Sequence, residues 1–366
     1  MKNINRLLNK FIKLLNKHTL LLALLVSISF IIIAVGFGWY NNKVVLPTTN
    51  PIARYKAEPN NPLSFMSNWD GPNYISLSLH GYQSVKQTNF FPLYPLLIHL
   101  VHYMISSPLN SAILVSWLSL IGAVYFYIKI LKHLFNIKKN VEAVTGLMFF
   151  ILFPTAIFLA ATYATSLLIF TGLASIYFAL KKNYLASGIF GLIATVANAN
   201  GGFALVLACL ILYEEKEKLY KIAITFIIGI LGLVGYSIYL TVRFSQPLAF
   251  ILSQKNHGWL NHNYSELIST ADFFNIFFIL LLIIAIIYWW NKRRSLSIFS
   301  FLFLLIPIVG NQFGGFNRYV LEAYSIPLMA FDYLKAHKIL YPIIFGIMGI
   351  IWAYFVFQYA GGYVGG

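Results

Sequence analysis

The sequence predicts an all-α polytopic membrane protein, a bundle of about eleven transmembrane helices with a structured first external loop. Hydrophobic residues make up 59% of its 366 residues and charged residues only 10%, and the mean hydropathy is +0.75. A soluble domain carries about 25% charged residues. Long apolar stretches recur along the chain, and basic clusters separate them in alternate loops. We therefore expect one integral membrane domain over residues 1–366.

Membrane spans require roughly 20 apolar residues, which decides how the apolar stretches are interpreted. Residues 92–106 are shorter and carry two prolines and two histidines, so we expect an interfacial or re-entrant segment there. The short segments 184–199 and 201–213 are expected to be half-buried or broken helices that line a cavity. The expected spans are 19–40, 110–134, 142–159, 163–180, 184–199, 201–213, 220–243, 271–290, 296–310, 317–334 and 338–358.

The net charge is +16, and the basic residues that produce it are distributed among the loops as the positive-inside rule requires. The charge therefore indicates a membrane topology, and we expect no nucleic-acid partner. With the N-terminus in the cytoplasm, nineteen of the 26 Lys and Arg residues lie on the cytoplasmic side and seven on the other. The C-terminus then lies outside. The active site is expected on the non-cytoplasmic face, of the plasma membrane in a prokaryote or of the endoplasmic reticulum in a eukaryote.

Residues 1–18 are expected to be a cytoplasmic basic segment. Its apolar residues have helical spacing, which predicts an amphipathic helix on an anionic leaflet. A solvated topogenic tail is the alternative. The apolar run that follows lacks a small-residue cleavage site, so we expect an uncleaved first span. Cys209 is the only cysteine, which excludes a disulfide framework and a cysteine metal cluster.

Residues 41–109 are expected to form an external catalytic loop with interfacial or re-entrant helices. Five prolines punctuate residues 41–91, and aromatic residues such as Trp69, Tyr74 and Tyr82 accompany them. Aromatic rings favour the level of the lipid headgroups. The segment is too aromatic to be a disordered linker, which indicates a structured platform on the membrane surface.

Asp70 is the strongest candidate for chemistry. The chain has only ten acidic residues, and an ionisable group at a membrane edge is costly to keep. It stands in Trp69-Asp70-Gly71, about twenty residues before Phe90-Phe91-Pro92-Leu93-Tyr94-Pro95. A catalytic base is one interpretation. A helix N-cap is the other, because Gly71-Pro72 resembles the start of a helix. The two roles are compatible.

Arg318 and Glu322 are four residues apart at the outer end of an expected span, hence on one helix face. Arg318 could bind a phosphate through two hydrogen bonds. Alternatively, the two side chains neutralise each other. Lys255, His257 and Trp259 of the second external loop could add phosphate and sugar contacts or form a solvated rim. No three His, Asp or Glu residues have zinc-like spacing, so we expect no metal and no cofactor.

These motifs resemble the PIG-V-type mannosyltransferases, a branch of the GT-C superfamily of polyprenyl-phosphate-sugar-dependent membrane glycosyltransferases. The resemblance starts with Trp69-Asp70-Gly71, Gly81-Tyr82 and the Phe90–Pro95 motif, and it continues in order through nearly the whole chain. The later matching stretches are Phe153-Pro154 with Tyr163 and Ser166-Leu167, Asn200-Gly201, Pro247-Leu248-Ala249-Phe250 with Gln254 and Trp259, Arg318-Tyr319-Val320-Leu321, and Gly361-Gly362-Tyr363-Val364.

The resemblance implies a GT-C bundle whose first external loop bears the catalytic acid. Such enzymes transfer a sugar, typically mannose, from a polyprenyl-phosphate donor to a lipid or glycan acceptor and invert the anomeric centre. Asp70 is then the general base, and Arg318 binds the donor phosphate, with Lys255 and His257. The residues expected to contact substrate are Trp69, Tyr74, Tyr82, Tyr163, Trp259, Tyr319 and Glu322.

Several positions depart from the family pattern. Thr165 and Asn198 stand where the family usually has Glu and Arg, and Ser245-Gln246 replaces a Gly-Asp pair. These departures leave a catalytically degenerate scaffold as an alternative. A transporter of lipid-linked substrates is another. It should show related halves and polar residues at the bilayer midplane, whereas the polar residues here gather at the outer boundary.

Overall fold

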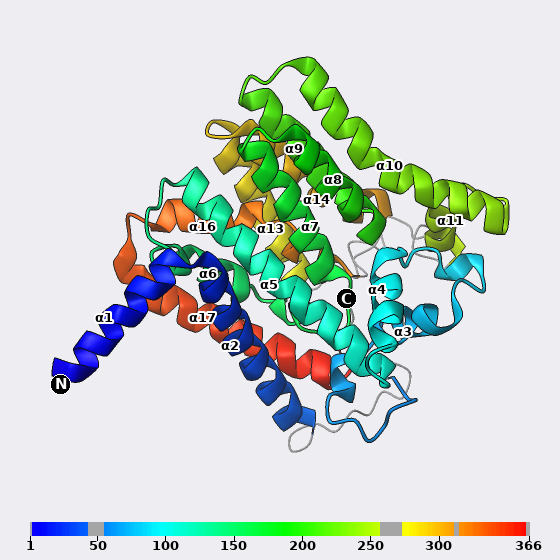
Figure 1. The fold of residues 1–366 in the computed structure, drawn as a ribbon, viewed down its shortest axis with the longest axis horizontal. Helices are drawn as coiled ribbons and strands as arrows, with labels where there is room; N and C mark the ends of the chain where they lie inside the picture. The colour runs from blue at the N-terminus through cyan, green and yellow to red at the C-terminus, as the bar shows by residue number, and fades with distance from the viewer. Residues whose placement is uncertain (1, 43–54, 257–272, 311–314, 364–366) are drawn as a thin grey trace.

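The structure, a computed structural model, describes residues 2–42, 55–256, 273–310 and 315–363. Within these ranges the regular secondary structure is helical and contains no β-strand (Figure 1). The all-helical class is therefore confirmed. The number of eleven spans and the GT-C type of bundle stay predictions.

Five helical segments of the described ranges are long and apolar enough to cross a membrane, which agrees with a polytopic membrane protein. Each is at least 18 residues long. They are α2 (Thr19–Tyr40), α5 (Pro108–Leu134), α10 (Leu219–Phe244), α13 (Phe273–Trp290) and the segment Lys338–Gly361, which contains η5 (Lys338–Leu340) and α17 (Tyr341–Ala360).

Shorter apolar helices pack between the long ones. The central one is α7, which is buried along nearly its whole length and packs against α5, α8 and α9. Helix α8 also packs along α10, and α14 packs along α13 (Figure 1). The bounds are α7 (Thr165–Leu180), α8 (Tyr184–Ala197), α9 (Gly201–Glu214) and α14 (Arg294–Gly310).

The expected span 142–159 is wrong as one continuous helix. The structure has α6 (Ala143–Ile151), a break, and the 3-10 helix η4 (Ala156–Leu159). Pro154 lies in the break. Proline lacks the N–H that a helix needs, and it pushes the preceding residue, Phe153, away from the helical region. The apolar composition of this stretch concealed the interruption.

The expected span 317–334 is also broken. Helix α15 (Phe316–Leu321) ends before Glu322, and α16 (Ser325–Leu334) starts after a turn. Pro327 is the reason. In one continuous helix it would have no N–H to donate to the Ala323 carbonyl, and its ring would clash with that carbonyl. In the first turn of a new helix those costs are absent. The break interrupts the helix with a turn at residues 322–324.

The first loop region folds into a compact set of short helices, η2 (Ser64–Met66), α3 (Gly71–His80), η3 (Val85–Gln87) and α4 (Leu93–His102). Figure 1 shows α3 and α4 together at one edge of the bundle. Helix α4 has ten residues, so it extends about 15 Å and is too short to span a bilayer. The C-terminal helix meets this region, because Asn68 Nδ2 donates a 2.7 Å hydrogen bond to the Tyr359 carbonyl.

The basic N-terminal segment forms helix α1 (Lys2–Lys17), which extends away from the bundle (Figure 1). Its end is fixed to the loop before α6, where Asn140 Nδ2 donates to the Leu15 carbonyl at 2.9 Å. Phe11 and Leu14 are exposed on it. The predicted amphipathic helix is present, and its position on a leaflet stays a prediction.

Candidate functional site

Asp70 and Arg318 form an ion pair although 248 residues separate them in the sequence. The Arg318 Nη1 atom lies 2.5 Å from Asp70 Oδ2. The Arg318 side chain is 9% exposed and that of Asp70 is 20% exposed. The pair is therefore shielded from bulk solvent, with the carboxylate as its more accessible half.

The backbone around Asp70 is tightly constrained. Asp70 occupies the N-cap position of α3, but its side chain makes no capping hydrogen bond. The preceding residue, Trp69, has a φ of +57°, a left-handed conformation that is rare for a bulky side chain. A Cβ on Gly71 would lie 2.3 Å from Thr162 Oγ1 and 2.5 Å from Ser67 Oγ. The carboxylate is directed to Arg318 and does not cap the helix.

The Arg318 guanidinium is held by aromatic groups. Its carbon lies 5.1 Å from the ring centroid of Tyr163 and 5.0 Å from that of Tyr319, and Nη2 donates to the Tyr319 hydroxyl at 3.2 Å. Burial is the largest single influence on the pKa of Arg318 and acts to lower it, but the Asp70 carboxylate and the surrounding tyrosines together outweigh burial, and the pKa is raised. Arg318 therefore stays cationic in this buried place.

Glu322 does not neutralise Arg318, so the self-compensating pair considered from the sequence is wrong. Helix α15 ends at Leu321, and the buried Glu322 carboxylate accepts a 2.7 Å hydrogen bond from Asn200 Nδ2. Burial raises the pKa of Glu322 to about 7, against lowering by Asn200 and Arg318. The site therefore holds two carboxylates, and only Asp70 is paired with the guanidinium.

Tyrosines predicted to contact substrate fall into two groups. Tyr163 and Tyr319 flank Arg318, and the Tyr163 hydroxyl accepts a 3.3 Å hydrogen bond from the Asp70 amide. Tyr74 lies edge-on to Tyr163, with 6.4 Å between ring centroids. Tyr82 packs instead against Tyr236 and Tyr239 of α10. The structure thus brings three of the four tyrosines to the ion pair and places Tyr82 beside α10.

The second external loop adds little to this geometry. Lys255 belongs to α11 (Ala249–Asn256), but its side chain lies outside the described part of the chain, as do His257 and Trp259. Their expected phosphate and sugar contacts stay predictions. Within the described residues, no three His, Cys, Asp or Glu side chains are grouped so as to hold a metal ion.

Sequence reasoning missed the polar neighbours of the ion pair. Eleven buried side-chain polar atoms of the described residues have no hydrogen-bond partner, and four of them are Ser67 Oγ, Asn68 Oδ1, Trp69 Nε1 and Asn317 Oδ1. They belong to the residues directly before Asp70 and Arg318. An unpaired buried polar group costs about 1–3 kcal/mol, so the cluster is suited to a polar ligand. The sequence did contain a signal for these atoms. Ser67, Asn68 and Trp69, three consecutive residues with hydrogen-bonding side chains, precede Asp70 in a chain that is mostly apolar.

The positions that depart from the expected motif pattern have different surroundings. Thr165 is buried at the start of α7. Asn198 Oδ1 accepts a 3.0 Å hydrogen bond from the Asn200 amide and so supports the turn that carries the Glu322 contact. Gln246 is exposed just before α11. Asn198 is thus linked to the site through Asn200.

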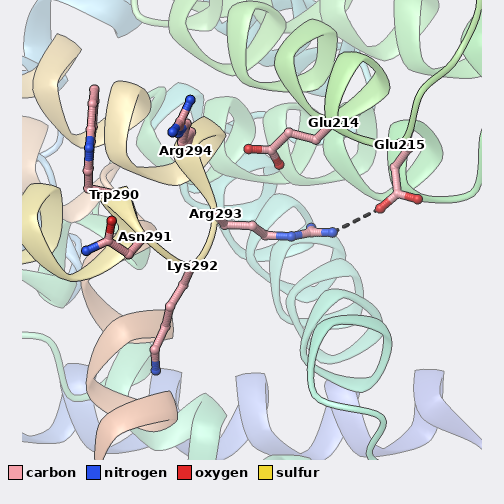
Figure 2. A pocket seen from close by; sticks show the side chains of 7 residues that line it. All are labelled: Glu214, Glu215, Trp290, Asn291, Lys292, Arg293 and Arg294. Carbon is pink, nitrogen blue, oxygen red and sulfur yellow. Dashed lines mark hydrogen bonds and ion pairs between the residues drawn. The ribbon is translucent and has the colours of Figure 1, made fainter.

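A charged pocket of about 430 Å³ lies at the far end of α9 from Asn200 (Figure 2). Its two acids are engaged: Glu214 accepts hydrogen bonds from the Ser295 amide and hydroxyl, and Glu215 pairs with Arg293 at 3.0 Å. Helix α9 has 14 residues, which separates the two ends by about 21 Å. This pocket is distinct from the Asp70–Arg318 site. Its lining residues are Glu214, Glu215, Trp290, Asn291, Lys292, Arg293 and Arg294.

Comparison with known families gives one assignment. The chain matches the family model described as Mannosyltransferase (PIG-V) over residues 8–264. That stretch includes Asp70, Tyr74 and Tyr163 and ends before Arg318. No curated protein matches the chain.

Proposed function

The chain belongs to the mannosyltransferase (PIG-V) family, and we propose that it transfers mannose from a polyprenyl-phosphate donor to a lipid or glycan acceptor on the non-cytoplasmic face. Membership makes it a membrane glycosyltransferase that uses a lipid-linked sugar donor. The GT-C class, the face of the membrane and the inverting course of the reaction are parts of the proposal.

The observation that carries the proposal is the contact between Asp70 and Arg318. Asp70 accepts the proton of the acceptor hydroxyl while that oxygen attacks the anomeric carbon. The bond between this carbon and the phosphate oxygen breaks, and its electron pair leaves with the polyprenyl phosphate. A single displacement of this kind inverts the anomeric centre. General-base assistance contributes typically about 10²–10⁴-fold.

Arg318 binds and stabilises the phosphate leaving group. Its planar guanidinium can donate two hydrogen bonds to a phosphate, and such charge-assisted bonds stabilise the charge that develops as the phosphate departs. The rings of Tyr163 and Tyr319 fix the plane of the guanidinium. A buried arginine that stays cationic is suited to this task.

The ion pair also gives an order of events. Before the donor binds, a carboxylate oxygen of Asp70 is occupied by its hydrogen bond from Arg318. When the donor phosphate takes over the guanidinium, that oxygen is released and can accept the proton of the acceptor hydroxyl beside the sugar.

The unpaired polar atoms of the residues directly before Asp70 and Arg318 support a sugar site. Asn68 Oδ1 and Asn317 Oδ1 are acceptors, and Trp69 Nε1 is a donor. A sugar hydroxyl can both donate and accept hydrogen bonds, so one mannosyl group can satisfy several of these atoms at once. Their cost in the empty site becomes binding energy in the complex.

The test is mannose transfer by the purified full-length protein in lipid nanodiscs, with a radiolabelled polyprenyl-phosphate mannose and lipid acceptors. Asp70→Asn keeps size and removes basicity. We expect its transfer rate to fall by at least about 10²-fold with unchanged thermal unfolding. Transfer at the wild-type rate by this variant would eliminate Asp70 as the base.

Asp332→Asn is the matched control. Asp332 is also a shielded acid in ion pairs, with Lys292 at 2.9 Å and with Lys335, but it lies beside the charged region at the other end of the bundle. We expect it to retain transfer activity. If the wild type instead moves intact donor across vesicles and transfers no sugar, the protein is a transporter; if it does neither, it is a scaffold.

A further inference from the structure

Tyr359 lies one residue before the C-terminal end of helix α17, and its side chain is fully buried. Its ring packs edge-on against the rings of Phe158 and Tyr163, with 5.5 Å and 6.1 Å between centroids. Helix α17 also packs against η2 and η4. The last helix of the chain therefore reaches the segment that leads to Asp70.

Both the side chain and the backbone of Tyr359 bind that segment. The Tyr359 hydroxyl accepts a 3.2 Å hydrogen bond from the Asn68 amide and donates to the Met66 carbonyl at 3.1 Å. The Tyr359 carbonyl accepts the 2.7 Å hydrogen bond of Asn68 Nδ2. Asn68 and Tyr359 are 291 residues apart, so these contacts are tertiary. They fix the backbone two residues before the Asp70 carboxylate.

The two glycines that follow α17 end the helix at this contact. Gly362 has a φ of +79°, the left-handed conformation that commonly terminates a helix. Its amide donates to the Tyr359 carbonyl at 3.0 Å. That carbonyl thus has two donors, the Gly362 amide and Asn68 Nδ2. The C-terminal glycine pair therefore helps to hold Tyr359 against the segment.

Trp69 lies between two residues that tyrosines hold. On one side, the Tyr359 hydroxyl accepts a hydrogen bond from the Asn68 amide. On the other side, the Tyr163 hydroxyl accepts one from the Asp70 amide. Trp69 itself has a φ of +57°, a conformation that persists in a bulky residue only where the surroundings impose it. Release of either anchor would let Trp69 return to a negative φ and would turn the Asp70 carboxylate.

We propose that Tyr359 is a positioning residue for the transfer reaction. It holds Trp69 in its left-handed conformation and thereby aims the Asp70 carboxylate at the acceptor hydroxyl. The inference rests on the proposed function, which makes Asp70 the general base. Loss of the Tyr359 hydroxyl should misdirect this base without removing it. A displacement of about 1 Å can lower a rate roughly 100-fold.

A residue that aims the base should affect kcat and leave KM for the donor unchanged. The donor phosphate is proposed to bind Arg318, and the rings of Tyr163 and Tyr319 hold that guanidinium. Phenylalanine in place of Tyr359 keeps the ring that packs on Tyr163 and loses only the hydroxyl. This substitution therefore separates the aim of the base from the binding of the donor.

The test is steady-state mannose transfer by Tyr359→Phe in lipid nanodiscs, with a radiolabelled polyprenyl-phosphate mannose. We expect kcat to fall about 10–100-fold and KM for the donor to stay the same. In the Asp70→Asn background the same substitution should not lower the residual rate further, because no base is left to aim. An equal fall in both backgrounds would show a general structural role and would overturn the proposal.

Tyr127→Phe is the matched control. Tyr127 is also fully buried, but its hydroxyl has no hydrogen-bond partner among the described residues. We expect wild-type kcat and KM. Hydrogen–deuterium exchange provides a readout that needs no turnover. Amides of residues 66–70 should exchange faster in Tyr359→Phe than in the wild type, and Tyr127→Phe should match the wild type.

Wild-type kcat in Tyr359→Phe, or a raised KM with an unchanged kcat, would overturn the proposal. Unchanged exchange over residues 66–70 would do so as well, since the segment would then not depend on the Tyr359 hydroxyl. Failure of the proposed function is a separate outcome, in which the wild type itself transfers no mannose.

Discussion

The Arg318 guanidinium lies over the ring of Tyr163, and the hydroxyl of the same tyrosine accepts the hydrogen bond of the Asp70 amide. One side chain thus fixes both halves of the ion pair. Tyr163 starts the turn that enters α7, the most deeply buried helix of the central bundle. The relative position of the Asp70 and Arg318 side chains is therefore tied to the core of the bundle.

Arg318→Lys tests whether the shape of the cation matters. Lysine can keep the charge opposite Asp70, but it loses the planar fork and the stacking on Tyr163 and Tyr319. We expect kcat/KM for mannose transfer to fall roughly 10²-fold, the size of effect that follows loss of a charge-assisted donor to a developing charge. Steady-state kinetics with a polyprenyl-phosphate donor measures this.

Arg293→Lys serves as the control for Arg318→Lys. Arg293 is likewise paired with a carboxylate, Glu215 at 3.0 Å, but it lies in the charged pocket at the far end of α9 (Figure 2). We expect wild-type kcat/KM for this variant. If both substitutions reduce activity equally, Arg318 has no special relation to the donor phosphate.

Gly71→Ala tests the close packing beneath the carboxylate. Its new methyl group would meet Thr162 Oγ1 and Ser67 Oγ at distances that real Cβ atoms do not show. Overpacking of this kind costs typically about 1–3 kcal/mol. We expect a lower Tm together with a loss of transfer activity, because the backbone on either side of Asp70 must shift.

Gly202→Ala provides the comparison for Gly71→Ala. A Cβ at Gly202 would meet nothing within 4 Å, and the residue lies in the first turn of α9. Alanine is a better helix former than glycine, so we expect an unchanged or higher Tm. A stable and active Gly71→Ala protein would mean that the segment around Asp70 is looser than its packing implies.

The sequence allowed the class of fold and the two ends of the site to be predicted, but not how the ends meet. Asp70 and Arg318 were each conspicuous as rare charged residues in an apolar chain, and the family resemblance related them. Their pairing across 248 residues depends on tertiary packing, which no spacing encodes. The same limit applies to Asn200 and Glu322, which meet through the ends of α9 and α15.

The two interrupted segments share a cause, an internal proline in an apolar stretch. Apolar composition outweighed Pro154 and Pro327 when spans were assigned, so two interrupted segments were predicted as continuous helices. The second error affected the site, because a continuous helix would place Glu322 one turn beyond Arg318 and favour their pairing. Giving more weight to an internal proline would have predicted the turn at residues 322–324 and left Glu322 available for another partner.

Glu322 provides a prediction for pH. It lies in the turn between α15 and α16, outside the five described segments that are long and apolar enough to cross a membrane, and burial raises its pKa from 4.5 to about 7. Between these two values the folded protein binds a proton there and the unfolded chain does not. The unfolding free energy should therefore be highest below pH 4.5, as far as this group is concerned, and fall as the pH rises to about 7.

Glu322→Gln cannot ionise and keeps an oxygen that accepts the Asn200 hydrogen bond, so its Tm should depend less on pH across this window. Exposed Glu142→Gln should follow the wild type. Equal slopes of Tm against pH for wild type and Glu322→Gln would show that the buried carboxylate does not take up the proton.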